Sequence, residues 1–132
     1  MKIKDLSKVL FETATEGLLI TNDKGIIQII NPQMEALFGY SNEELIGKKV
    51  EILIPNKLRK THINHREKYH EKPSKRSMGL GMNLLGQKKD GSTVPIEISL
   101  NHFLVEGQQM VMALVSDITT RNEILKQLKK EK

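Results

Sequence analysis

Three of the four histidines in this 132-residue chain lie within a short stretch, at His62, His65 and His70. An imidazole can ligate a metal ion, exchange a proton or form hydrogen bonds. His62 and His65 are three residues apart, so on a helix they would share one face and could contact the same ion. A zinc site needs at least three protein ligands, and no suitable third ligand lies nearby in the sequence. We therefore expect no metal site built from this pair alone.

Basic residues surround these histidines. Residues 55–76 contain eight Lys or Arg against two Glu, in a chain of formal net charge +5. Proteins that bind single-stranded nucleic acid add aromatic side chains for stacking, but aromatic residues make up only 4% here. We therefore expect no nucleic-acid partner. The basic residues predicted to coat the solvent face of a helix are Lys57, Arg59, Lys60, Arg66 and Lys68.

The residues that are absent exclude several kinds of chemistry. The chain has no cysteine, which removes disulfides, thiolate metal sites, catalytic thiols and thiol-linked flavin, and which suits a cytoplasmic location. No constellation of nucleophile and base, phosphate loop or paired carboxylates indicates an enzyme. The apolar runs are shorter than the ~20 residues that span a membrane. We expect no membrane contact by this segment, although a larger parent protein could be membrane-anchored.

Turn and capping residues divide the first seventy residues into short elements. Apolar residues at helical spacing predict an amphipathic helix over 3–14. Two apolar runs flank residues 22–25 (NDKG), whose types favour a hairpin turn. The Asn-Pro pair at 31–32 and the S-x-x-E box that begins at Ser41 each predict a short helix. Residues 56–72 contain no Gly or Pro, which predicts one longer helix carrying the clustered histidines.

The last third of the chain changes character. Residues 77–88, 92–105 and 108–118 are predicted to be three strands separated by glycine-containing turns. With the two earlier strands they predict an α+β fold, in which one antiparallel sheet is covered on one face by helices and a pocket lies between them. Apolar residues at roughly heptad spacing then predict that 119–132 begins a coiled coil.

Several motifs give the chain a resemblance to a known family. Residues 17–55 resemble the first half of a PAS sensor domain; their sequence is GLLITNDKGIIQIINPQMEALFGYSNEELIGKKVEILIP. Its second half resembles KKDGSTVPIEISL (88–100), and its end resembles SDITTR (116–121). The resemblance covers about residues 10–121 and rests on the order and spacing of these motifs. It implies a PAS-like five-stranded antiparallel sheet, with flanking helices at both ends, around a ligand or signal site.

The resemblance also implies how a signal would leave the domain. PAS domains often dimerise through flanking helices and regulate an output module, such as a histidine kinase or a cyclic-dinucleotide enzyme. Asp117 can cap the exit helix, and Arg121 lies one helical turn further on, within reach of a carboxylate. The resemblance assigns signal transmission to Asp117, Thr119 and Arg121. A plain helix cap with a surface ion pair is the alternative.

Resemblance to one PAS subgroup suggests that His62 is a haem ligand. The stretch IPNKLRKTH (54–62), followed by LGM (80–82) and KKDG, resembles the subgroup that includes oxygen-sensing haem proteins. There a histidine at the position of His62 ligates the iron, and an arginine stands where this chain has Met82. If haem binds, the resemblance implies a six-coordinate His62/Met82 site rather than oxygen binding as in those sensors. A buried His62 that packs or hydrogen-bonds is the preferred interpretation.

The expected organisation is an N-terminal flanking helix (1–14), a PAS domain (15–118) and a C-terminal linker helix (119–132). We predict a non-enzymatic, homodimeric sensor domain that passes a pocket or interface signal through the linker helix to a linked or partner output module. A small-molecule ligand would suit the pocket. Two alternatives stay open: a haem-based redox or gas sensor with His62 as axial ligand, and a constitutive dimerisation module without a ligand.

Overall fold

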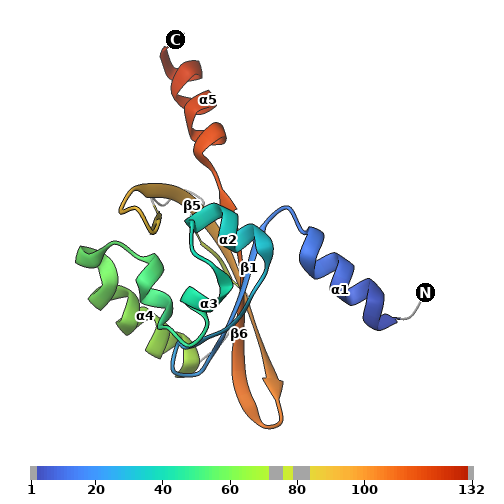
Figure 1. The fold of residues 1–132 in the computed structure, drawn as a ribbon. Helices are drawn as coiled ribbons and strands as arrows, with labels where there is room; N and C mark the ends of the chain where they lie inside the picture. Colours follow the sequence, from blue (N-terminus) through green and yellow to red (C-terminus); the bar gives the residue numbers. More distant parts are fainter. Residues whose placement is uncertain (1–2, 72–75, 79–83, 131–132) are drawn as a thin grey trace.

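An antiparallel sheet forms the centre of the fold (Figure 1). The structure, a computed structural model, describes residues 3–71, 76–78 and 84–130. In this part of the chain the strand order is β2-β1-β6-β5-β3, and β4 also pairs with β5. The strands are β1 (Gly17–Asn22), β2 (Ile27–Ile30), β3 (Arg76–Met78), β4 (Leu85–Gln87), β5 (Thr93–Val105) and β6 (Gln108–Asp117).

The single strand predicted over 77–88 appears as the two short strands β3 and β4. Both pair antiparallel with β5: Met78 lies opposite Ile98, and Leu85 lies opposite Pro95. They therefore extend along one edge of β5, and the predicted five-stranded α+β architecture is confirmed. Residues 79–83, which include Met82, lie outside the described residues.

Helices cover one face of this sheet, while the first and last helices extend away from it (Figure 1). The predicted helix over 56–72 begins instead as a 3₁₀ turn and becomes α-helical at Arg59. The α-helices are α1 (Ile3–Thr13), α2 (Pro32–Phe38), α3 (Asn42–Leu45), α4 (Arg59–Glu71) and α5 (Thr119–Lys130), and the 3₁₀ helices are η1 (Val50–Leu53) and η2 (Asn56–Leu58). None of the helices in the described ranges is long and apolar enough to cross a membrane.

The predicted capping residues explain why the short helices form. The side chain of Asn31 accepts a hydrogen bond from the backbone of Met34 at the start of α2. Ser41 and Glu44 form both bonds of a capping box at the start of α3. These bonds satisfy backbone N–H groups that the helix itself leaves unpaired.

The core lies between the sheet and helices α2 and α3. Its largest fully buried apolar side chains are those of Ile27, Met34, Phe38 and Leu45. Along β1, burial alternates with the period of two expected of a strand with one packed face. The same inward face continues into a cavity beside α4.

Candidate functional site

A largely apolar cavity of about 340 Å³ is lined by strands of the sheet and by α4. This volume is at the lower end of the range for small-molecule pockets, roughly 300–1,000 Å³. Strands β5 and β6 contribute an apolar wall, which consists of Ile98, Leu100, Val111, Ala113 and Val115.

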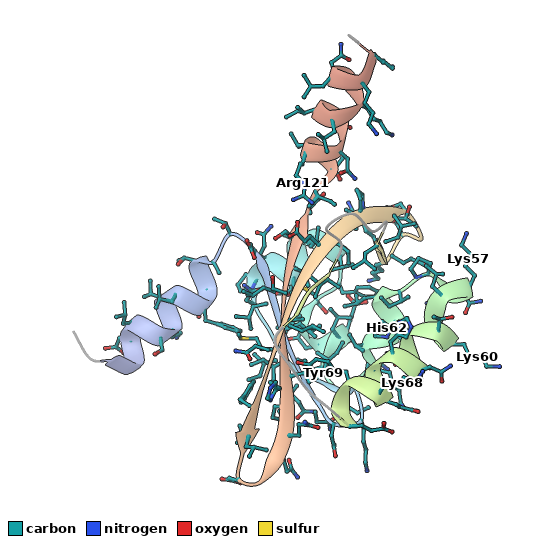
Figure 2. The ribbon with its side chains drawn as sticks, turned by 180° about the vertical axis from the view of Figure 1, so that it is seen from behind. Lys57, Lys60, His62, Lys68, Tyr69 and Arg121 are labelled. Carbon is teal, nitrogen blue, oxygen red and sulfur yellow. The ribbon has the colours of Figure 1, made fainter. Side chains whose placement is uncertain are left out.

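One face of α4 supplies most of the polar groups of the cavity. These residues recur at intervals of three to four, as they must to share one helical face, and they are Thr61, His62, His65, Arg66 and Tyr69. The predicted solvated face is occupied by Lys57, Lys60 and Lys68, which are exposed and point away from the body of the domain in Figure 2. The prediction that Arg66 belongs to the solvent face was wrong, because its side chain is only 10% exposed.

Arg66 is buried because it binds a buried carboxylate. Its Nε and Nη2 atoms donate to Oε2 and Oε1 of Glu51, each at 3.0 Å. His62 Nδ1 lies 2.6 Å from Glu51 Oε2. Glu51 comes from η1 and both partners come from α4, so the cluster ties these two elements together beside the cavity.

The environment of Glu51 keeps its carboxylate ionised. Burial alone would raise the pKa of Glu51, but the hydrogen bonds from His62 and Arg66, together with their charge, outweigh burial and lower it from 4.5 to about 2. An ionised carboxylate can only accept hydrogen bonds, so Nδ1 of His62 must carry the proton in this contact. Nε2 is then the ring nitrogen that a neutral His62 has available for another partner.

The other residues considered as metal or haem ligands are less informative. His65 is exposed and lies at the edge of the cavity. His70 belongs to α4, but its side chain and all of Met82 lie outside the described residues. Among the described residues, no group of three His, Asp or Glu side chains is placed to hold a metal ion.

The three residues predicted at the exit of the sheet lie together. Asp117 Oδ1 accepts hydrogen bonds from the backbone N and the hydroxyl of Thr119, at 2.9 and 2.6 Å. Arg121 Nη1 forms a 2.7 Å ion pair with Oε2 of Glu97 on β5, and Figure 2 places Arg121 at the base of α5. The backbone N of Ile118 donates to Pro95 O at 3.1 Å. The exit helix is thus bound to β5 as well as continuous with β6.

The sequence did not single out Glu51 or Thr21 as site residues. It predicted Asn31 only as a helix cap. The signal for Glu51 was a single charge inside an apolar segment, since charged residues are seldom buried unless they are paired. Asn31 is completely buried, and its side chain bonds α1, the following loop and β1 in addition to α2. Thr21 could have been found as a polar residue at an inward position of β1.

Comparison with known proteins agrees with this fold. A sequence model of the PAS fold matches residues 6–118. The chain belongs to the PAS family. This PAS chain is 34% identical over 101 residues to the oxygen sensor protein DosP of Escherichia coli K12, covering 76% of this chain and 13% of DosP. It is 28% identical over 114 residues to the sensor protein FixL of Bradyrhizobium diazoefficiens, covering 86% of this chain and 23% of FixL.

Solved structures give the same fold. The crystal structure of a PAS domain from Colwellia psychrerythraea superposes with a TM-score of 0.77 at 22% identity, covering 90% of this chain and 99% of that one. By contrast, the chain spans less than a quarter of the length of FixL or DosP. The fold and family are therefore those of one PAS domain, a sensory and non-catalytic fold.

Proposed function

We propose that this PAS domain is a homodimeric sensor that passes a signal from its cavity through α5 to an output module such as a histidine kinase. The observation that carries the proposal is that the strands lining the cavity are the strands that hold α5. Ile98 of β5 lines the cavity, and its neighbour Glu97 binds Arg121 of α5. The absence of cysteine suits a cytoplasmic setting for such a domain.

Strand geometry makes this arrangement suitable for transmission. Successive side chains point to opposite faces of a strand, so Ile98 and Glu97 lie on opposite faces of β5. A shift of the strand would therefore move both side chains. If β5 can adopt two positions, a ligand that binds more tightly to one of them would increase the population of that position. Through the Glu97–Arg121 pair and the Asp117 cap, that shift would change the direction in which α5 leaves the sheet.

The surfaces of the flanking helices support dimerisation. Helices α1 and α5 each expose apolar side chains that an isolated chain would leave in water. The exposed large apolar residues are Leu6, Val9 and Leu10 on α1, and Ile124, Leu125 and Leu128 on α5. Covering them against a second copy would place the two α5 helices where a paired linker could act on a following module.

Disulfide trapping tests the pairing of α5, because the chain has no native cysteine. Leu125→Cys lies on the exposed apolar side of α5, and Gln127→Cys is the matched control on the same helix. In a parallel pair, Leu125→Cys should form an intermolecular disulfide under mild oxidation, and Gln127→Cys should form several-fold less. Equal, slow cross-linking at both positions would contradict pairing through this face.

The link between sheet and helix is tested in the same background. Glu97→Gln removes the partner of Arg121 and should change the cross-linking rate of Leu125→Cys at least twofold. Glu106→Gln, in the turn between β5 and β6, changes the charge equally and should have no effect. A cross-linking rate that neither substitution changes would favour a constitutive dimerisation module.

A haem-based redox or gas sensor is the second candidate, and the position of His62 favours it. His62 lines the cavity, and the proton on Nδ1 is held by Glu51, as in many metal-binding histidines that donate to a carboxylate. His62 Nε2 would hold the iron, and haem would supply the redox or gas-binding centre. Because a porphyrin is several times larger than the 340 Å³ cavity, haem would enter only if α4 and the sheet moved apart. The similarity to the oxygen sensor protein DosP adds support.

Absorbance spectra decide this candidate. Purified protein supplied with haem should show a Soret band that His62→Ala removes and that His65→Ala, three residues along the same helix, retains. The absence of a band in the unsubstituted protein would end the hypothesis.

A further inference from the structure

Thr21 is a buried polar residue that lines the cavity, and its hydroxyl forms no hydrogen bond with another described residue. The residue is only 5% exposed and lines the cavity on the same face of β1 as Leu19. None of the side-chain hydrogen bonds in the described part of the chain involves Thr21, and it is not among the residues with further contacts. Buried hydroxyls are normally paired, so a cavity-lining residue whose hydroxyl has no partner in the described part of the chain is a suitable place for a ligand acceptor.

Arg66 adds unpaired donors at the same end of the cavity. Its Nε and Nη2 atoms are bound to Glu51, whereas Nη1 has no acceptor among the described residues. A Cβ built on Gly25 would approach Arg66 Nε to 2.5 Å, so the guanidinium lies directly against the turn that follows β1. Thr21 is one residue from the end of β1, at Asn22, and therefore belongs to the same end of the hairpin.

The rest of the cavity is apolar, and its surroundings are positively charged. The described residues of η2 and α4 contain five Lys or Arg against two Glu, so the field around α4 favours an anion. The ionised carboxylate of Glu51 neutralises only one of these charges. If each non-hydrogen atom fills about 30 Å³, the share of one water in the liquid, the 340 Å³ cavity holds about ten to twelve such atoms.

We propose that the cavity binds an unbranched monocarboxylate of about eight to ten carbons in total. The carboxylate lies at Thr21 and Nη1 of Arg66, and the tail lies against the apolar wall of β5 and β6. This assignment rests on the proposed sensor function and names the class of ligand that would be sensed.

Titration calorimetry of the whole chain tests the ligand class with hexanoate, octanoate, decanoate, dodecanoate and octan-1-ol. Affinity should rise about fourfold per methylene until the cavity is filled, and it should stop rising between decanoate and dodecanoate. Octan-1-ol should bind at least tenfold more weakly than octanoate, because it lacks the charge. No binding of any carboxylate, or equal binding of the alcohol, would overturn the proposal.

Thr21→Val tests the head-group contact with almost no change of shape. It should weaken octanoate binding about three- to tenfold, the range expected for one hydrogen bond, and it should raise the Tm of the unligated protein. Thr93→Val is the matched control, because Thr93 is exposed on β5 and does not line the cavity; it should leave octanoate affinity unchanged.

Two results with Thr21→Val would overturn the assignment: unchanged octanoate affinity, or a lowered Tm, which would mean that the hydroxyl already has a partner. Cross-linking of Leu125→Cys without ligand is independent of these measurements. If it occurs while carboxylates fail to bind, the ligand class is wrong and the dimeric linker of the proposed function stands. If α5 fails to cross-link, the proposed function fails by itself.

Discussion

Glu51 is a buried charge whose position depends on two partners from another element. Its carboxylate would be costly to bury alone, and His62 and Arg66 compensate by three hydrogen bonds. The reverse also holds, because the buried guanidinium of Arg66 depends on the same carboxylate. Removing one member therefore leaves the others in an unfavourable environment.

Glu51→Gln should lower the free energy of unfolding by about 3–5 kcal/mol, because it leaves the buried charge of Arg66 without a counter-ion. Urea unfolding followed by circular dichroism measures this. Glu97→Gln breaks an ion pair in which Arg121 is 45% exposed, and as the control it should cost less than about 1 kcal/mol. Similar losses in both variants would contradict a special role for the buried cluster.

The lowered pKa of Glu51 also predicts how stability depends on pH. The folded-state pKa of about 2 lies below the ordinary value of 4.5. Its contribution, ~3 kcal/mol, is therefore fully present above about pH 4.5. It is lost as the pH falls from 4.5 towards 2. Unfolding free energies measured from pH 6 to pH 2.5 should fall less steeply in Glu51→Gln than in the unsubstituted protein, and parallel curves would contradict the assignment.

At the scale of elements, Asn31 joins parts of the chain that the sequence keeps apart. Its Oδ1 accepts from the backbone of Leu18 and Met34, at 2.8 and 3.1 Å, and its Nδ2 donates to Glu16 O at 3.0 Å. Asn31→Ala should cost about 2–4 kcal/mol in chemical unfolding, since it removes a cap and leaves several backbone groups unpaired. Ser41→Ala, which removes only the cap of α3, should cost about 1 kcal/mol. Equal losses would mean that Asn31 acts only as a cap.

Substituting two glycines that have similar backbone angles distinguishes the cost of backbone strain from the cost of a steric clash. Gly25 and Gly91 have φ values of +76° and +90°. A Cβ at Gly25 meets Arg66, whereas a Cβ at Gly91 has nothing within 4 Å. Gly91→Ala should cost about 1 kcal/mol from strain alone. Gly25→Ala should cost at least 2 kcal/mol more in the same thermal unfolding experiment, because Arg66 must leave Glu51; equal costs would contradict this coupling.

How far sequence reasoning succeeded depended on whether an interaction was local. The hairpin turn, the Asn31 cap and the capping box of Ser41 and Glu44 were all predicted, because each involves residues within a few positions of one another. The Glu51–Arg66 contact spans fifteen residues and depends on how α4 packs against η1. Helical spacing alone could not show that Arg66 faces inward, since the residues next to it in the sequence, His65 and Glu67, are polar and exposed.

At the scale of the whole molecule, the cavity lies inside the domain, whereas the apolar residues of the flanking helices face the solvent. The cavity is lined by α4 and by the inner face of the sheet. Helices α1 and α5 extend away from this body and expose apolar residues (Figure 1). The strands β5 and β6, with the junction of Asp117 and Arg121, connect the cavity to α5, and this is the route that the cross-linking experiments examine. Strand β1, which also lines the cavity, follows α1.

Removing residues 119–132 tests which flanking helix holds the proposed dimer together. No described residue of α5 is buried within the chain, so the truncated protein should keep its fold, although it also loses the Glu97–Arg121 pair and the Asp117–Thr119 hydrogen bonds. Sedimentation velocity should show at least tenfold weaker self-association, with the far-UV signal of the sheet preserved. As a milder version, Leu125→Asn with Leu128→Asn should weaken association in the untruncated chain, whereas Lys126→Ala with Gln127→Ala should not. A dimer unchanged by all of these would place the interface elsewhere, with the exposed apolar residues of α1 or the sheet as the next candidates.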